Sequence, residues 1–241
     1  MSEKNMQKKE IRRFVAFCRL MPVFGGILAV FIGIIVLIWI RTAGENTNGV
    51  SSLISIFAPR VYVEPIVSAA EQFPDFNIQE QFLTINDYSR PGDEIDPIQK
   101  IVIHYTGNPG TTAQANRDYF ESLAENPVTS ASSHFVIGLN GEIIQCVPLN
   151  EIAYASNKAN SYSISIECCH PDESGEFSTA TYNQCVALTA ELCKYYHLDP
   201  ETDVIRHYDV TGKECPRFYV DHPDEWNMFI GFVKARLDSE S

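Results

Sequence analysis

The amino-acid sequence predicts an α/β domain built on a single mixed β-sheet with flanking helices. A short run of β-branched residues at 100–104 is typical of a strand covered on both faces. An Asn-Gly pair at 140–141, between two strand-like runs, is a strong hairpin signal. Apolar residues recur at helical spacing over 181–196. Buried strands, a hairpin and helices within about 140 residues fit one domain of common size.

The expected elements follow one another through residues 97–241, the range assigned to this domain. Helices are expected at 114–123, 181–196 and 223–237, and strands at 100–104, 133–138, 142–147, 163–168 and 203–206. The run at 163–168 alternates strictly, so Ile164 and Ile166 share one face and Ser165 and Glu167 the other.

Residues 41–96 are expected to form a stalk and lead-in. Prolines recur through this range and discourage long regular elements. A short helix is expected at 67–73, and the Ser-Arg-Pro-Gly sequence at 89–92 is a turn signal.

An uncharged apolar run covers residues 21–40 and is long enough to cross a membrane as a helix. The basic segment 1–20 precedes it, so the positive-inside rule predicts a signal anchor with residues 1–20 cytoplasmic and everything after residue 41 extracellular. A cleaved signal peptide is the first alternative, although the run exceeds the usual apolar length of about 7–15 residues. A buried core helix is the second, and the basic flank disfavours it.

The charge is distributed unevenly around a formal net value of −13. Residues 1–41 carry seven Lys/Arg and two Asp/Glu, whereas residues 42–241 carry eleven and 29. A domain this acidic offers no surface that would neutralise phosphates, which excludes nucleic acid as a partner.

One short loop near the C-terminus holds His207, Lys213 and Cys215, and a further imidazole, His104, ends the first buried strand. Imidazole and thiolate are ligands that zinc prefers, and a catalytic zinc takes three protein ligands and leaves one position open. His104, His207 and Cys215 are therefore a candidate zinc site. The alternative is that Cys215 forms a disulfide, because the six cysteines that follow the apolar run could pair completely.

Four motifs carry a resemblance to a known family. They are Ile-Val-Ile-His-Tyr-Thr-Gly at 101–107, Ser-His-Phe-Val-Ile-Gly at 133–138, Ser-Ile-Ser-Ile-Glu at 163–167 and Arg-His-Tyr-Asp-Val-Thr-Gly-Lys-Glu-Cys-Pro at 206–216. In this order they resemble the zinc-dependent N-acetylmuramoyl-L-alanine amidases, which include phage lysozyme-type amidases and peptidoglycan recognition proteins. The resemblance spans roughly 97–235. It implies the fold of that family, peptidoglycan as substrate, and hydrolysis of the amide between the muramic acid lactyl group and L-alanine.

By the same resemblance, His104, His207 and Cys215 are the zinc ligands, Lys213 matches a lysine of the phage type and Glu167 matches a glutamate of the bacterial type. Ser133 stands where the phage type has a tyrosine. The version of the mechanism that uses Glu167 is therefore preferred.

These roles make chemical sense, and each has a plainer alternative. Glu167 would accept a proton from the attacking water and Lys213 would stabilise the oxyanion, or both would be ordinary surface residues. His134 would hold the site residues in position without binding the metal itself, or it would be a core histidine. Arg217 would meet a stem-peptide carboxylate or form a surface salt bridge. Two rival functions remain: a muropeptide sensor that binds without cleaving, and a disulfide-stapled structural ectodomain.

Overall fold

A computed structural model describes residues 66–239. Its sheet has six strands in the order β1-β4-β3-β5-β2-β6. The strands are β1 Ile78–Glu80, β2 Lys100–Tyr105, β3 Phe135–Ile137, β4 Ile143–Gln145, β5 Ser163–Cys168 and β6 Val204–Arg206. The helices are α4 Ala69–Gln72, α5 Ala113–Ser122, the 3-10 turn η1 Asn157–Ala159, α6 Thr179–Tyr196, α7 Pro200–Asp203, α8 His207–Thr211, α9 Arg217–Asp221 and α10 Pro223–Ser239.

The sheet is mixed, as the sequence predicts. β2 pairs in parallel with both β5 and β6, and β5 pairs in parallel with β3. The hairpin β3–β4 is antiparallel, and its turn passes through Gly141 at φ 84°, a left-handed conformation that glycine adopts without strain. The predicted hairpin and the strands that form its two arms are therefore confirmed.

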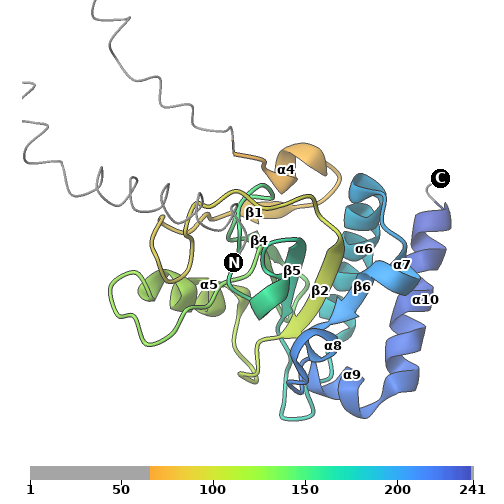
Figure 1. Ribbon diagram of the computed structural model, residues 1–241. Helices are drawn as coiled ribbons and strands as arrows, with labels where there is room; N and C mark the ends of the chain where they lie inside the picture. Colours follow the sequence, from red (N-terminus) through yellow and green to blue (C-terminus); the bar gives the residue numbers. More distant parts are fainter. Residues whose placement is uncertain (1–65, 240–241) are drawn as a thin grey trace, which may run out of the picture. The chain divides into compact units, whose positions relative to one another are not determined.

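Helices cover both faces of the sheet (Figure 1). On one face α5 packs against β3 and β4, where Phe120, Val136 and Ile144 belong to one apolar cluster. On the other face α6 packs against β2, β3 and β5, and α10 lies against α6. Phe135 and Ile137 of β3 face this second cluster, since alternate residues of a strand point to opposite sides.

The lead-in contributes to the core before residue 97, where the domain was expected to begin. Ala69 and Phe73 are buried in the larger cluster, and β1 pairs in parallel with β4 at the sheet edge. Helix α4 lies within the short helix expected at 67–73. Prolines keep these elements short, but short elements still bury side chains.

The first part of the expected stalk, the basic segment 1–20 and the anchor 21–40 lie outside the described residues. Within residues 66–239, no helix has both the length and the apolar character needed to span a membrane.

The cysteines of residues 66–239 are all free and buried. They are Cys146, Cys168, Cys169, Cys185, Cys193 and Cys215. The disulfide-stapled alternative is therefore wrong for this part of the chain. That alternative assumed that the six cysteines after the apolar run pair with one another. These thiols are instead buried within the domain, several of them in the apolar clusters.

Candidate metal centre

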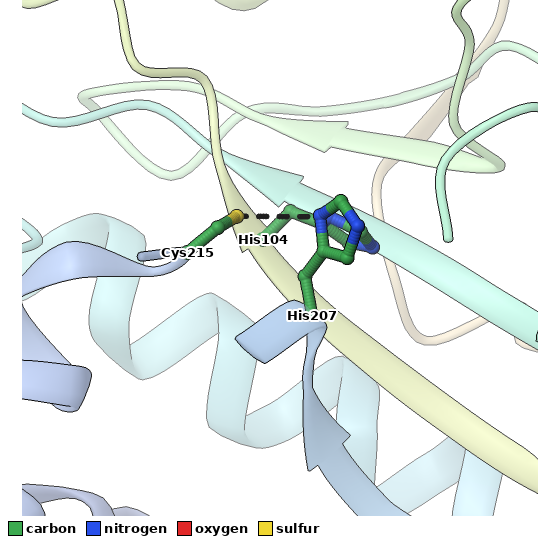
Figure 2. Close-up of side chains that lie close together, drawn as sticks. All are labelled: His104, His207 and Cys215. Atoms are coloured by element: carbon green, nitrogen blue, oxygen red, sulfur yellow. Dashed lines mark hydrogen bonds between the residues drawn. The ribbon is translucent and has the colours of Figure 1, made fainter. Parts of the chain in front are cut away.

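Two parallel strands bring the two histidines together. Ile103 of β2 pairs with Arg206 of β6, so the residues that follow them, His104 and His207, leave adjacent strands at the same level. His104 is within β2, and His207 opens α8. Cys215 comes from the segment between α8 and α9 and reaches the same point (Figure 2).

The three side chains form a tight, buried group. Their ligand atoms all lie within 4.8 Å of one another. The Sγ atom of Cys215 is 3.8 Å from Nδ1 of His104, and the two imidazole rings have centroids 4.7 Å apart. All three residues are buried. Residues far apart in the sequence thus converge on one point, as the sequence predicts.

The donor atoms suit a metal that takes imidazole and thiolate. Both ring nitrogens of His207 are buried and have no hydrogen-bond partner among residues 66–239, which is costly unless something binds them. Burial, and then the nearby Lys213 charge, lowers the pKa of His207, so its ring is neutral and offers a lone pair. Burial also lowers the pKa of His104 well below its ordinary value. Burial raises the pKa of the Cys215 thiol to about 12, so a metal would displace its proton on binding.

Glu167 stands beside this group. It pairs with His104 across β5 and β2, and its Oε1 is 3.9 Å from His104 Nδ1. Its Oε2 is buried and has no hydrogen-bond partner within the described part of the chain. Burial raises the pKa of Glu167 to about 8, and the charge of Lys213 opposes that rise. The Glu167 side chain is 17% exposed, so most of it is buried beside the candidate ligands.

Lys213 follows the end of α8, where Gly212 turns the chain at φ 79°. The lysine is exposed and lines the same cleft as Glu167. Its positive charge acts on His104, His207 and Glu167. It is therefore close enough to this group to stabilise negative charge that develops there.

An open cleft of about 530 Å³ gives access to the group. Its walls come mainly from three loops, at 129–132, 154–157 and 211–213. Hydroxyl and amide side chains are common along them, whereas Glu167 is the one carboxylate among the lining residues. Such a surface suits a polar substrate that carries hydroxyl and amide groups.

Three other candidates lie away from this cleft. His134 is a buried core histidine, with Nδ1 at 3.0 Å from Ser165 Oγ and Nε2 at 3.0 Å from the Glu151 carbonyl. The hydroxyl of Ser133 donates to backbone within the sheet. The guanidinium of Arg217 donates to the Glu173 carbonyl at 3.4 Å and is not among the cleft-lining residues.

Sequence reasoning missed Ser156, whose hydroxyl lies 3.0 Å from Nε2 of His104. It also missed the loop at 129–132 as a cleft wall. Neither segment carries a residue type or spacing that marks a site.

A buried His-His-Cys group that could hold a metal thus lies beside a carboxylate, and its two histidines line a polar cleft. The chain belongs to the N-acetylmuramoyl-L-alanine amidase family, whose model matches residues 94–218. The fold and the motif resemblance to that family are thereby confirmed.

Known relatives agree with this assignment. The N-acetylmuramoyl-L-alanine amidase BlyA of Bacillus subtilis (strain 168) is 33% identical over 180 residues, covering 66% of this chain and 47% of the relative. The N-acetylmuramoyl-L-alanine amidase CwlL of Bacillus licheniformis is 33% identical over 176 residues, covering 68% of this chain and 48% of the relative. The chain thus spans about half the length of these curated relatives.

Among solved structures, the catalytic domain of XlyA superposes with a TM-score of 0.55 at 31% identity, covering 66% of this chain and 99% of that domain. The catalytic domain of PlyG has a TM-score of 0.57 at 24% identity, covering 67% of this chain and 96% of that chain, a likeness of fold. The matched region thus corresponds to a complete catalytic domain.

Proposed function

We propose that this chain is a zinc-dependent N-acetylmuramoyl-L-alanine amidase that hydrolyses the amide between the lactyl group of muramic acid and L-alanine in peptidoglycan. The observation that carries the proposal is the buried group of His104, His207 and Cys215, which opens onto a cleft lined by Glu167 and Lys213. Membership of the family and the names of the relatives support it.

Zinc is the metal that best suits two neutral imidazoles and one thiol. His104, His207 and Cys215 would hold it. When bound there, zinc supplies Lewis-acid polarisation of a carbonyl and acidifies water.

The protein's own groups carry the proton transfers. Glu167 accepts the proton of the attacking water through its unpartnered Oε2 and then delivers it to the departing amine of L-alanine. Lys213 stabilises the negative charge that develops on the carbonyl oxygen as the water attacks. The hydroxyl-rich cleft walls orient the glycan and stem peptide around the scissile bond.

The decisive experiment incubates the full chain, in detergent, with purified peptidoglycan. We expect new N-terminal alanine and free lactyl groups to appear. Their release should stop when a chelator is added and resume when zinc is restored. Glu167→Gln should still co-sediment with peptidoglycan without releasing alanine. Binding with no release by the parent chain would instead support the sensor, and release by metal-free protein would contradict the proposed mechanism.

We also propose that residues 21–40 anchor the protein in the cell membrane, with the amidase domain on the wall side. The support is the length of that uncharged run and the basic residues that precede it.

A further inference from the structure

The two histidines of the metal centre are held in different ways. Nδ1 of His104 faces Cys215 Sγ at 3.8 Å, while its Nε2 lies 3.0 Å from the hydroxyl of Ser156. Both nitrogens of His207, by contrast, have no hydrogen-bond partner in the described part of the chain. Among the described residues, hydrogen bonding therefore orients the ring of His104 but not that of His207 before a metal arrives.

We propose that Ser156 is a positioning residue for the metal centre, because its hydroxyl oxygen accepts a hydrogen bond from the Nε2–H group of His104 and leaves Nδ1 free to bind the metal. The inference rests on the proposed function, since it assumes that His104 is a metal ligand. Its physical basis is the tautomer of a neutral imidazole, which carries one proton and one lone pair. A metal on Nδ1 requires the proton on Nε2, and that proton then needs an acceptor.

Burial makes this acceptor important. His104 is 1% exposed and Ser156 is fully buried, so bulk water does not readily replace the serine hydroxyl. A buried N–H group that loses its acceptor costs about 1–3 kcal/mol. Without Ser156, that cost would fall on the tautomer that binds the metal.

Ser156 does not use its hydroxyl in the role that serine usually has at this position. It is the N-cap of η1, where a serine side chain commonly accepts a backbone N–H of the first turn. Here the side chain makes no capping hydrogen bond and faces His104 instead. The hydroxyl thus forms its hydrogen bond with the candidate ligand His104 and not with the backbone of η1.

The backbone around Ser156 is firmly held. Oδ1 of Asn160 accepts the backbone N–H groups of both Ala155 and Ser156. The neighbouring Tyr154 exchanges two hydrogen bonds with Ser132, which ties this loop to the 129–132 wall of the cleft. The hydroxyl of Ser156 therefore has a fixed position from which to orient the His104 ring.

The experiment measures zinc affinity of the full chain by competition with a chromophoric chelator. Ser156→Ala should weaken zinc binding by about 10- to 100-fold, the usual effect of removing a hydrogen-bond partner of a ligating histidine. Ser156→Thr keeps a hydroxyl and should restore most of the affinity. The unfolding temperature of the metal-free protein should change little. Without a metal, His104 can adopt the other neutral tautomer, whose Nε2 carries no proton and so needs no acceptor.

Ser163→Ala is the matched control. Ser163 is also a buried serine, and its hydroxyl donates to the Ala159 carbonyl at the end of η1 without contacting His104. This variant should bind zinc as the parent does. If Ser156→Ala does not fold, Ser156→Gly removes the same hydroxyl at an N-cap position that tolerates glycine, adds no metal ligand and should still lower affinity.

The outcomes separate the inference from the function on which it rests. Parent-like zinc affinity in a folded Ser156→Ala or Ser156→Gly protein would overturn the positioning role and leave the amidase proposal standing. Equal losses in Ser156→Ala and Ser163→Ala would show a general effect of the loop and would also overturn it. A parent chain that holds no zinc would overturn both proposals.

Discussion

Replacing Glu167 with glutamine tests the proposed proton transfer most directly. Glutamine keeps the shape of the side chain but cannot accept a proton from water. Glu167 lies beside the candidate ligands, with Oε1 at 3.9 Å from His104 Nδ1, and is not one of the three clustered donors. The variant should therefore keep its zinc while losing turnover.

The residues that line the cleft determine how far the turnover rate should fall. No other carboxylate lines it among residues 66–239, so no neighbouring group is placed to take over as base. Loss of a general base typically costs about 10²- to 10⁴-fold in rate. We therefore expect kcat to fall by at least about 100-fold, which corresponds to about 2.7 kcal/mol of activation free energy.

The assay follows release of N-terminal alanine from peptidoglycan, with zinc content measured on the same samples. Glu214→Gln is the matched control, because Glu214 is exposed, sits next to Cys215 and does not line the cleft. It removes one negative charge near the centre and should leave kcat within about twofold of the parent, the range of a surface substitution. Parent-like turnover in Glu167→Gln would refute the role of the carboxylate as base.

Further expectations concern the metal, the oxyanion, pH and placement. Cys215→Ser should lower zinc retention against a chelator, since a hydroxyl is a poor ligand for zinc; unchanged retention would exclude the thiolate. Lys213→Ala should reduce kcat more than it changes KM, because its charge acts on the transition state; a change in KM alone would indicate ground-state binding. In metal-free protein, burial raises the pKa of Glu167 to about 8 from 4.5, so its folded state keeps a proton that the unfolded chain releases. That stabilisation is full below pH 4.5 and is lost as the pH rises towards 8. The unfolding temperature of the parent should therefore fall relative to that of Glu167→Gln over this range, a comparison in which the contribution of the buried histidines cancels. Protease added to wall-stripped cells should remove the amidase domain and leave a protected fragment that contains residues 21–40; a mature protein released into the medium would instead indicate a cleaved signal peptide.

The sequence predicts those parts of the fold that depend on local pattern. The strand at 100–104 is recognisable because β-branched residues suit a strand buried on both faces. The Asn-Gly turn identifies the hairpin because its backbone geometry needs a left-handed residue. The convergence of His104 and His207 is predictable too, since the ends of neighbouring parallel strands meet at one edge of a sheet.

Other elements depend on contacts that no local pattern contains. Strand β1 has three residues and exists because β4, more than sixty residues later, pairs with it. Helices α7, α8 and α9 have four or five residues each, too few to display helical periodicity. The link between Ser156 and His104 joins residues 52 positions apart through a single hydrogen bond. Such features follow from the assembled fold and not from the segment that carries them.

The free thiols bear on why Cys215 is available to a metal. A domain that relied on disulfides would need its cysteines in pairs, yet all six in the described residues are unpaired and buried. Two apolar clusters, one on each face of the sheet, supply the burial that stabilises the fold without cross-links. Cys215 is thus left as a thiol 3.8 Å from an imidazole nitrogen, and neither nitrogen of His207 has a hydrogen-bond partner among the described residues. An unsatisfied buried group costs about 1–3 kcal/mol, so a metal bound here would relieve a penalty that the fold otherwise carries. Part of the metal-binding free energy then also becomes folding free energy, which couples the stability of the domain to the chemistry that it is proposed to perform.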